Sequence, residues 1–357
     1  MDKEGNSQAK LNPTPKTESE KLQGKIYLKV EQVSTHEHRD LIGDDWTFLA
    51  LKSPTCYMIA THKRGLKVIE NNVEVYCAEL PIPLTSLVNI AYIDHLDSYI
   101  FNNRGKLFRK DINDKPPYLC LDMLPQWNPG AILLYSKVNK RLIVNENWND
   151  IAILNLERKG SEILIKSKVG NTINEIKLFG RDERGLISLT NYGEIHLTII
   201  NYQMKKVFAN NNFKIQLKQG RTEISRCFAI CEKFKYALVE IISQYTDRTS
   251  RMVILTIKNS RFLSIRATFD FYLDFLDPKN LLEFYGYFGN HPLWVGLSEK
   301  DGDCCFFDYD TKEKELKELV EKRVSHQEYE PWKIQRCGNH LYYTGYGGRV
   351  MRLTLGR

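Results

Sequence analysis

Short polar turns recur along this chain at a nearly constant spacing, and that period constrains the fold more than any other feature. Each turn separates two apolar runs, and successive turns lie 41, 44, 43, 51, 57 and 49 residues apart. The turns centre on Pro54, His95, Asn139, Asp182, Lys233, Asn290 and Asn339. Roughly 40 to 45 residues is typical of repeat units built from four strands, and loops such as residues 243–251 lengthen the later steps. The chain therefore accommodates seven such units.

Within each unit the runs predict β-strands. After the second run of five units comes a further turn with a glycine, which adopts positive φ without a Cβ clash; these are Gly65, Gly105, Gly193, Gly302 and Gly348. Third runs follow, at residues 105–109, 151–156, 252–257, 304–309 and 349–355. Fourth, more polar runs occupy residues 116–124, 161–169 and 261–269. Since β-branched and aromatic residues are frequent in these runs, they favour strands over helices.

The two ends of the repeat decide the architecture. The seventh unit stops after three runs, at residues 332–337, 341–345 and 349–355, and lacks a fourth. Residues 25–33, KIYLKVEQV, alternate apolar and polar side chains and have no other partner in the repeat. Pairing this strand with the last unit closes the ring and removes unpaired sheet edges. The sequence predicts an all-β, seven-bladed β-propeller over residues 25–357, with blades from about residue 46 and a flexible polar tail at residues 1–24.

Two structural alternatives remain open at this point. Residues 312–322, KEKELKELVEK, place Leu316, Leu319 and Val320 at helical spacing, so the outer strand of the sixth blade has a short helix as its alternative. Two β-sandwich domains also accept many short strands. They explain neither the long period nor the missing last strand.

One segment resembles a known repeat family. The run at residues 304–307 leads into Asp308-Tyr309-Asp310-Thr311-Lys312, which is similar to the end of the third strand of WD repeats. The period and pattern extend this resemblance from Lys25 to the end of the chain. It departs from the family because neither a Trp-Asp nor a Gly-His dipeptide occurs. The resemblance implies a propeller of degenerate WD-repeat type, without the family's usual buried polar network.

Composition and charge indicate an intracellular protein. No apolar stretch reaches the 18 residues expected of a membrane-spanning helix, and the first ten residues lack the pattern of a secretory signal. The eight cysteines show no repeated C-x-x-C spacing, so we expect reduced, mostly buried thiols in the cytoplasm or nucleus. The net charge of +7 permits acidic partners but lacks the dense basic stripes of a dedicated nucleic-acid binder.

Candidate catalytic and metal-binding patterns are weak. His36-Glu37-His38 offers two imidazoles but no third ligand, and a solvated loop explains it equally well. Asp94-His95-Leu96-Asp97 and Asp301-Gly302-Asp303 fit turn chemistry. No nucleophile motif and no phosphate-binding glycine loop occurs. We therefore expect neither an enzyme nor a bound metal or cofactor, with a propeller hydrolase as the remote alternative.

The repeat geometry instead points to one interaction face. In WD-type propellers the connections between second and third strands and those between blades share a face, which here also includes His36, Trp46 and Tyr245. The residues on it that we expect to bind a partner are Lys63, Arg64, Arg104, Trp127, Trp148, Tyr192, Arg221, Arg248, Tyr329 and Tyr346. Aromatic and Arg side chains often anchor interfaces, although each Trp also fits burial between blades. We expect a scaffold for other proteins, within a complex, that binds an acidic or phosphorylated segment; anionic lipid, such as phosphoinositide, or nucleic acid is the alternative.

Overall fold

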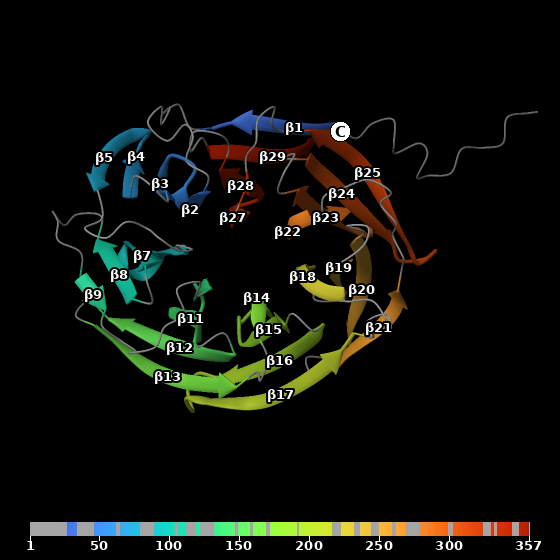
Figure 1. Ribbon diagram of the computed structural model, residues 1–357, viewed down its shortest axis with the longest axis horizontal. Coiled ribbons are helices and arrows are strands. Elements are labelled where there is room, and N and C mark those ends of the chain that lie inside the picture. The colour runs from blue at the N-terminus through green and yellow to red at the C-terminus, as the bar shows by residue number, and fades with distance from the viewer. Residues whose placement is uncertain are drawn as a thin grey trace, which may run out of the picture.

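The computed structural model describes residues 27–33, 46–61, 65–78, 89–103, 106–111, 119–121, 132–146, 149–157, 160–168, 172–190, 193–215, 223–231, 236–243, 250–258, 262–268, 279–298, 303–323, 330–331, 334–344 and 350–356. The chain folds as a seven-bladed β-propeller. Seven small sheets stand in a ring, each with its first strand nearest the axis (Figure 1).

The first three blades follow the chain in order. Blade 1 contains β2 (Trp46–Ser53), β3 (Cys56–Thr61), β4 (Gly65–Glu70) and β5 (Val73–Ala78). A short strand, β26 (Glu330–Pro331), pairs in parallel with the start of β2. Blade 2 contains β6 (Ile90–Ile93), the 3-10 turn η2 (Asp94–Leu96), β7 (Ser98–Asn103), β8 (Lys106–Asp111) and β9 (Leu119–Leu121). Blade 3 contains β10 (Leu133–Ser136), β11 (Arg141–Glu146), β12 (Asp150–Glu157) and β13 (Gly160–Lys168).

The remaining blades complete the ring. Blade 4 contains β14 (Ile173–Phe179), β15 (Gly185–Thr190), β16 (Glu194–Asn201) and β17 (Lys206–Lys214). Blade 5 contains β18 (Glu223–Ile230), β19 (Tyr236–Ser243), β20 (Ser250–Lys258) and β21 (Phe262–Thr268). Blade 6 contains β22 (Lys279–Phe288), β23 (His291–Ser298), β24 (Asp303–Asp310) and β25 (Glu315–Arg323). Blade 7 contains β27 (Gln335–Cys337), β28 (His340–Thr344), β29 (Val350–Gly356) and β1 (Tyr27–Gln32).

The seven predicted turn positions all separate the first and second strands of a blade. Pro54 lies between β2 and β3, and Asn339 lies between β27 and β28. The other five fall between the first and second strands of blades 2 to 6, and of these Lys233 lies outside the described residues. The period of the sequence therefore marks the connection between the first and second strands of every blade. The prediction of seven blades is confirmed.

The predicted closing strand also forms. β1 pairs antiparallel with β29, from Tyr27 opposite Gly356 to Gln32 opposite Met351. The pairing continues one residue further, because the backbone N–H of Val33 donates to the carbonyl of Val350 at 2.9 Å. The carboxylate of Glu31 accepts hydrogen bonds from the guanidinium of Arg352 on the neighbouring strand. The first strand of the chain thus completes its last blade.

The outer element of blade 6 is a strand, and the helical alternative for residues 312–322 is wrong. Each blade is packed between two others, so both of its faces are buried. Leu316 packs toward blade 5, whereas Leu319 packs toward blade 7. A register shift between Phe306 and Phe307 accompanies this arrangement. Residues three apart lie on one face of a helix but on opposite faces of a strand, so the same spacing fits a strand that is buried on both faces.

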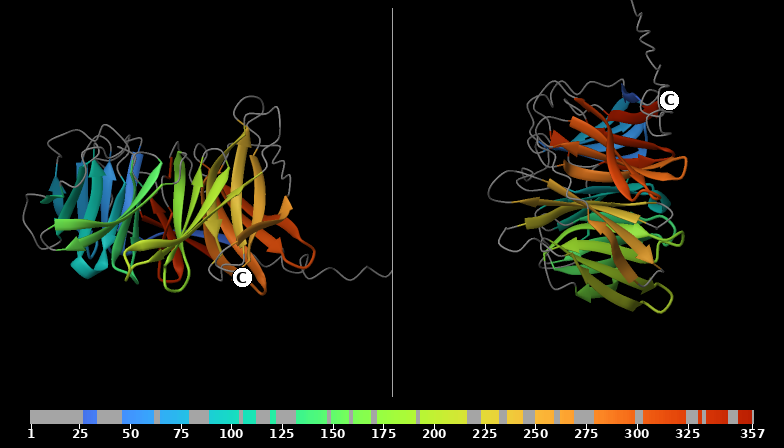
Figure 2. Two further views of the ribbon diagram at one scale, coloured as in Figure 1. Left: turned by 90° about the horizontal axis from the view of Figure 1, so that it is seen from below. Right: turned by 90° about the vertical axis from the view of Figure 1, so that its right-hand side faces the viewer.

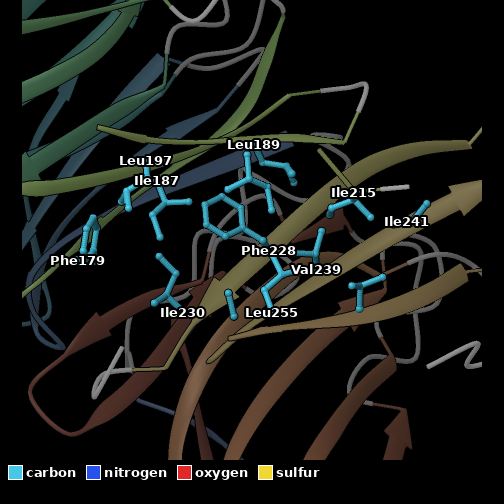
Figure 3. Packing of buried hydrophobic residues seen from close by; sticks show 13 residues of the cluster. Phe179, Ile187, Leu189, Leu197, Ile215, Phe228, Ile230, Val239, Ile241 and Leu255 are labelled. Atoms are coloured by element: carbon cyan, nitrogen blue, oxygen red, sulfur yellow. The ribbon is translucent and has the colours of Figure 1, made fainter. Parts of the chain in front are cut away.

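The core consists of apolar clusters between neighbouring blades. The described residues form seven clusters, one for each junction in the ring. Figure 3 shows the junction of blades 4 and 5, where Phe228 faces Ile187 and Leu189. Every residue of β15 is buried, because successive side chains point to opposite faces of the blade and both faces are covered by neighbouring blades. Gly185 is required in this strand, since a Cβ there would lie 1.8 Å from the ring of Phe179.

Candidate functional site

The connections of the propeller alternate between two faces because successive strands run in opposite directions. Connections from second to third strands, and from one blade to the next, start and end on one face, which we call the loop face. Connections from first to second and from third to fourth strands lie on the other, which we call the turn face. The left view of Figure 2 shows the ring edge-on, with these two faces along its long edges.

All ten residues predicted to bind a partner stand in connections that join strand ends on the loop face. The connections follow β3, β7, β9, β11, β15, β17, β19, β25 and β28. The residues themselves lie outside the described part of the chain: Lys63, Arg64, Arg104, Trp127, Trp148, Tyr192, Arg221, Arg248, Tyr329 and Tyr346. The partner-binding role of these side chains therefore stays a prediction, whereas the positions of the strand ends on either side of them are known.

Two of these connections belong to adjacent blades. β3 and β4 remain paired up to Thr61 opposite Gly65, and β7 and β8 remain paired up to Asn103 opposite Lys106. The two hairpins are held side by side, because Met58 and Ala60 of blade 1 share an apolar cluster with Phe101 of blade 2. Lys63, Arg64 and Arg104 fall in the short connections between these paired strand ends, outside the described residues.

The candidate metal and turn motifs have different outcomes. His36-Glu37-His38 and Tyr245 lie outside the described residues, and Trp46 begins β2. Residues 94–97 form a turn, as predicted, in which Asp97 adopts φ 48°. Its carboxylate accepts hydrogen bonds from Lys52 of blade 1 at 2.7 Å and from Tyr92 at 2.6 Å. Across the described ranges, no three His, Cys, Asp or Glu side chains gather as a metal site would require.

First strands from all seven blades line a cavity of about 660 Å³ on the axis of the ring, which we call the channel. Polar side chains on this wall join blades to one another. The amine of Lys177 on β14 lies 2.8 Å from Glu175 of its own strand and 3.0 Å from Glu283 of β22. Glu175 also accepts the backbone N–H of Phe228 on β18 at 2.9 Å. Blades 4, 5 and 6 are therefore connected through one charged cluster.

Electrostatics in the channel follow from burial and charge pairing. Burial raises the pKa of Glu175, against the opposing attraction of Lys177. Burial also works against the charge on Lys177, but Glu175 and Glu283 outweigh it, and the pKa of the amine is raised. The lysine therefore stays charged between two carboxylates. This charge pairing joins blades 4 and 6 at the wall of the cavity.

Blade 7 is joined to both of its neighbours on the same wall. The side-chain amide of Gln335 donates to the carbonyl of Leu49 at 2.5 Å and accepts from the N–H of Leu51 at 3.0 Å. The next residue, Arg336, donates to the carbonyls of Phe284 and Tyr285 in blade 6. The blade that contains the closing strand is thus fixed on either side by side-chain hydrogen bonds to backbone.

A second polar assembly lies on the turn face between blades 3 and 4. The Glu183 carboxylate accepts from the hydroxyl of Ser136 at 2.7 Å and from the N–H of Val138 at 3.1 Å. The Asn139 amide donates to the carbonyl of Asp182 at 2.7 Å, and the Tyr202 hydroxyl donates to the carbonyl of Glu183 at 3.3 Å. We call residues 137–141, 180–184 and 202–206 the turn cluster. Its three turns are joined through Glu183.

The segment at residues 308–312, which resembles the end of a WD-repeat strand, is held by polar contacts of its own. Asp308 is buried and lies 3.1 Å from Nδ1 of His291 on the adjacent strand, and burial raises the pKa of its carboxyl. Burial opposes the charge on Asp310, but the N–H groups of Glu313 and Lys312 outweigh it and lower the pKa of that carboxyl. Asp308 thus has a structural partner, and Asp310 caps the turn to β25.

Comparison with known proteins supports the fold only. No family model matches the chain, and no curated protein matches it. The crystal structure of a protein from Lactobacillus plantarum is similar, with a TM-score of 0.57 and 12% sequence identity over 79% of this chain and 85% of that one. In the described part of the chain, no helix has the length and apolar character needed to span a membrane.

Proposed function

We propose that this protein is a non-enzymatic interaction scaffold, a propeller of degenerate WD-repeat type that binds an acidic or phosphorylated protein segment on its loop face. The observation that supports this most directly is the register of the two hairpins in blades 1 and 2. Thr61 pairs with Gly65 and Asn103 pairs with Lys106, so the connections that contain Arg64 and Arg104 leave adjacent points of one rigid face.

Arginine suits this role chemically. Its planar guanidinium donates two parallel hydrogen bonds to a carboxylate or phosphate, and neighbouring guanidinium groups favour a ligand with several negative charges. The side chains joining the blades keep the two hairpins at a fixed separation, which lowers the entropic cost of binding. A ring that carries arginines in the connections of two adjacent hairpins therefore fits an acidic segment.

A non-enzymatic role is supported by the partners of the buried and partly buried carboxylates. Glu175 and Glu283 both contact Lys177, the buried Glu240 accepts from the thiol of Cys227 at 3.4 Å, and Asp308 contacts His291. Each of these carboxylates has a role in holding strands together. Such contacts are typical of structural polar groups rather than of catalytic ones waiting for a substrate.

The test is charge reversal at both hairpins. Arg64→Glu combined with Arg104→Glu should abolish capture of the natural protein partner in affinity purification, with an unchanged melting temperature. Lys312→Glu combined with Lys314→Glu reverses the same number of charges on the turn face and should retain the partner. A double variant at Arg64 and Arg104 that still purifies with all partners would contradict the proposal. Salt-sensitive binding of nucleic acid in place of protein would favour the alternative function.

A further inference from the structure

The turn cluster concentrates positive charge on the face opposite the proposed partner site. Six of its basic side chains are exposed, and they come from both blades: Lys137, Lys140, Arg181, Arg184, Lys205 and Lys206. Its one exposed acidic residue, Asp182, forms an ion pair with Arg184 at 3.3 Å. The equivalent turn of blade 6 is less basic, because Lys312 and Lys314 alternate there with Glu313 and Glu315.

Two large apolar side chains stand among these charges. Val138 is 57% exposed in the turn between β10 and β11, and Met204 is 58% exposed in the turn between β16 and β17. The backbone of each turn is held in place, since the N–H of Val138 donates to Glu183 at 3.1 Å and the N–H of Met204 donates to Asn201 at 2.9 Å. Both side chains are therefore presented outward by turns of fixed geometry.

We propose that the turn cluster is a docking surface for an anionic lipid bilayer. Basic groups at the level of the lipid phosphates, with apolar tips just beyond them, are the combination that an anionic interface attracts. An acidic peptide would match the charges, but its carboxylates offer no apolar surface to Val138 and Met204. A nucleic acid would match the charges and leave Val138 and Met204 exposed. The membrane is the occupant that accounts for both features.

Vesicle sedimentation with the full chain tests the proposal. The protein should sediment with phosphatidylcholine vesicles that contain about one third phosphatidylserine, and should stay in solution with pure phosphatidylcholine. Lys137→Glu combined with Arg181→Glu should weaken this binding at least about tenfold. Val138→Ser combined with Met204→Ser should weaken it severalfold with no change of charge. Raising the salt from about 0.1 M to about 0.5 M should release the protein.

Two controls separate this surface from the charge of the whole molecule. Lys312→Glu combined with Lys314→Glu, and Arg64→Glu combined with Arg104→Glu, should both retain vesicle binding. Thermal melting checks folding, and Lys137→Gln combined with Arg181→Gln replaces the reversal if that variant melts early. The proposal is overturned if anionic vesicles do not bind, if the cluster variants bind as well as the wild type, or if the controls lose binding equally. Cluster-dependent binding of polyglutamate or duplex DNA without vesicle binding would also overturn it.

Discussion

The guanidinium of Arg352 donates from Nε to the carboxylate of Glu31 at 3.1 Å, although 321 residues separate the two along the chain. Glu31 also pairs with Lys29 on its own strand. The pair of Glu31 and Arg352 spans the antiparallel ladder of β1 and β29, where the two residues lie directly opposite each other. It therefore joins the first and last strands of the propeller at the point where the ring closes.

Removal of the closing strand should destabilise the whole propeller. Deletion of residues 1–33 exposes the edge of β29 and removes every hydrogen bond of its ladder with β1, whereas deletion of residues 1–20 leaves that ladder intact. We expect the longer deletion to lower the melting temperature clearly and to increase aggregation, since open strand edges pair with other chains. The shorter deletion should melt like the full chain. Equal melting temperatures for the two truncations would contradict closure by β1.

The contribution of Glu31 should depend on pH. Hydrogen bonds from Lys29 and then Arg352 lower the pKa of Glu31 from 4.5 to about 2. A carboxyl whose pKa is lowered by folding stabilises the protein above its unfolded pKa, and this effect disappears as the pH falls toward the folded value. The melting temperature of Glu31→Gln should therefore lie below that of the wild type near neutral pH. The two should converge between pH 4.5 and about 2. A difference that stays constant over this range would show that the charge of Glu31 contributes nothing.

Loss of Lys177 should destabilise the channel wall. Lys177→Met leaves Glu175 and Glu283, which both contact the amine, without their cation. Because all three side chains are about one fifth exposed, we expect a loss of roughly 1–3 kcal/mol in the free energy of unfolding, less than for a fully buried pair. The loss should be smaller near pH 4 than near pH 7, because burial raises the pKa of Glu175 and protonation removes that uncompensated charge. Denaturant unfolding at the two pH values measures it.

A second substitution provides the control for the channel. Glu283→Gln in the Lys177→Met background removes one of the two uncompensated carboxylates and should recover part of the stability. Without such recovery, the effect of Lys177→Met would have to come from packing alone.

The six cysteines whose burial the structure describes should divide into two classes. Cys227, Cys231, Cys304 and Cys305 are buried and unbridged, whereas Cys56 and Cys337 are partly exposed. Alkylation of the native protein should modify the last two and spare the first four, because thiol reactivity requires access. Peptide mass spectrometry with and without denaturant measures the difference. A disulfide between Cys227 and Cys231, or rapid alkylation of Cys304 in the folded protein, would contradict this assignment.

The sequence was sufficient for the fold because a propeller repeats one local pattern. The turns at Pro54 to Asn339 and the unfinished seventh unit predicted both the number of blades and the closing strand. The spacing of Leu316 and Leu319 resembles that of a helix because this strand is buried on both of its faces. The burial of Trp294 between blades 5 and 6 could not be predicted, since a lone Trp has no periodic signal.

The polar assemblies were beyond the reach of sequence. Glu183 contacts Ser136 from 47 residues away, and Lys177 contacts Glu283 from 106 residues away. A repeat period shows which residues occupy equivalent positions in the blades. It does not show which side chains contact one another between blades. The turn cluster could not be predicted for the same reason, because its basic residues belong to three turns that adjoin only in the folded ring.

The pairing of Tyr27 with Gly356 has a mechanical consequence. These two residues begin β1 and end β29 at the same end of one antiparallel ladder. A force that pulls them apart would therefore break the ladder one hydrogen bond after another, as a zipper opens, instead of loading all its bonds together in shear. Resistance to force is set by the rate of unfolding rather than by the free energy of the folded state. A ring that resists heat well can thus still open at low tension when it is pulled by its two ends.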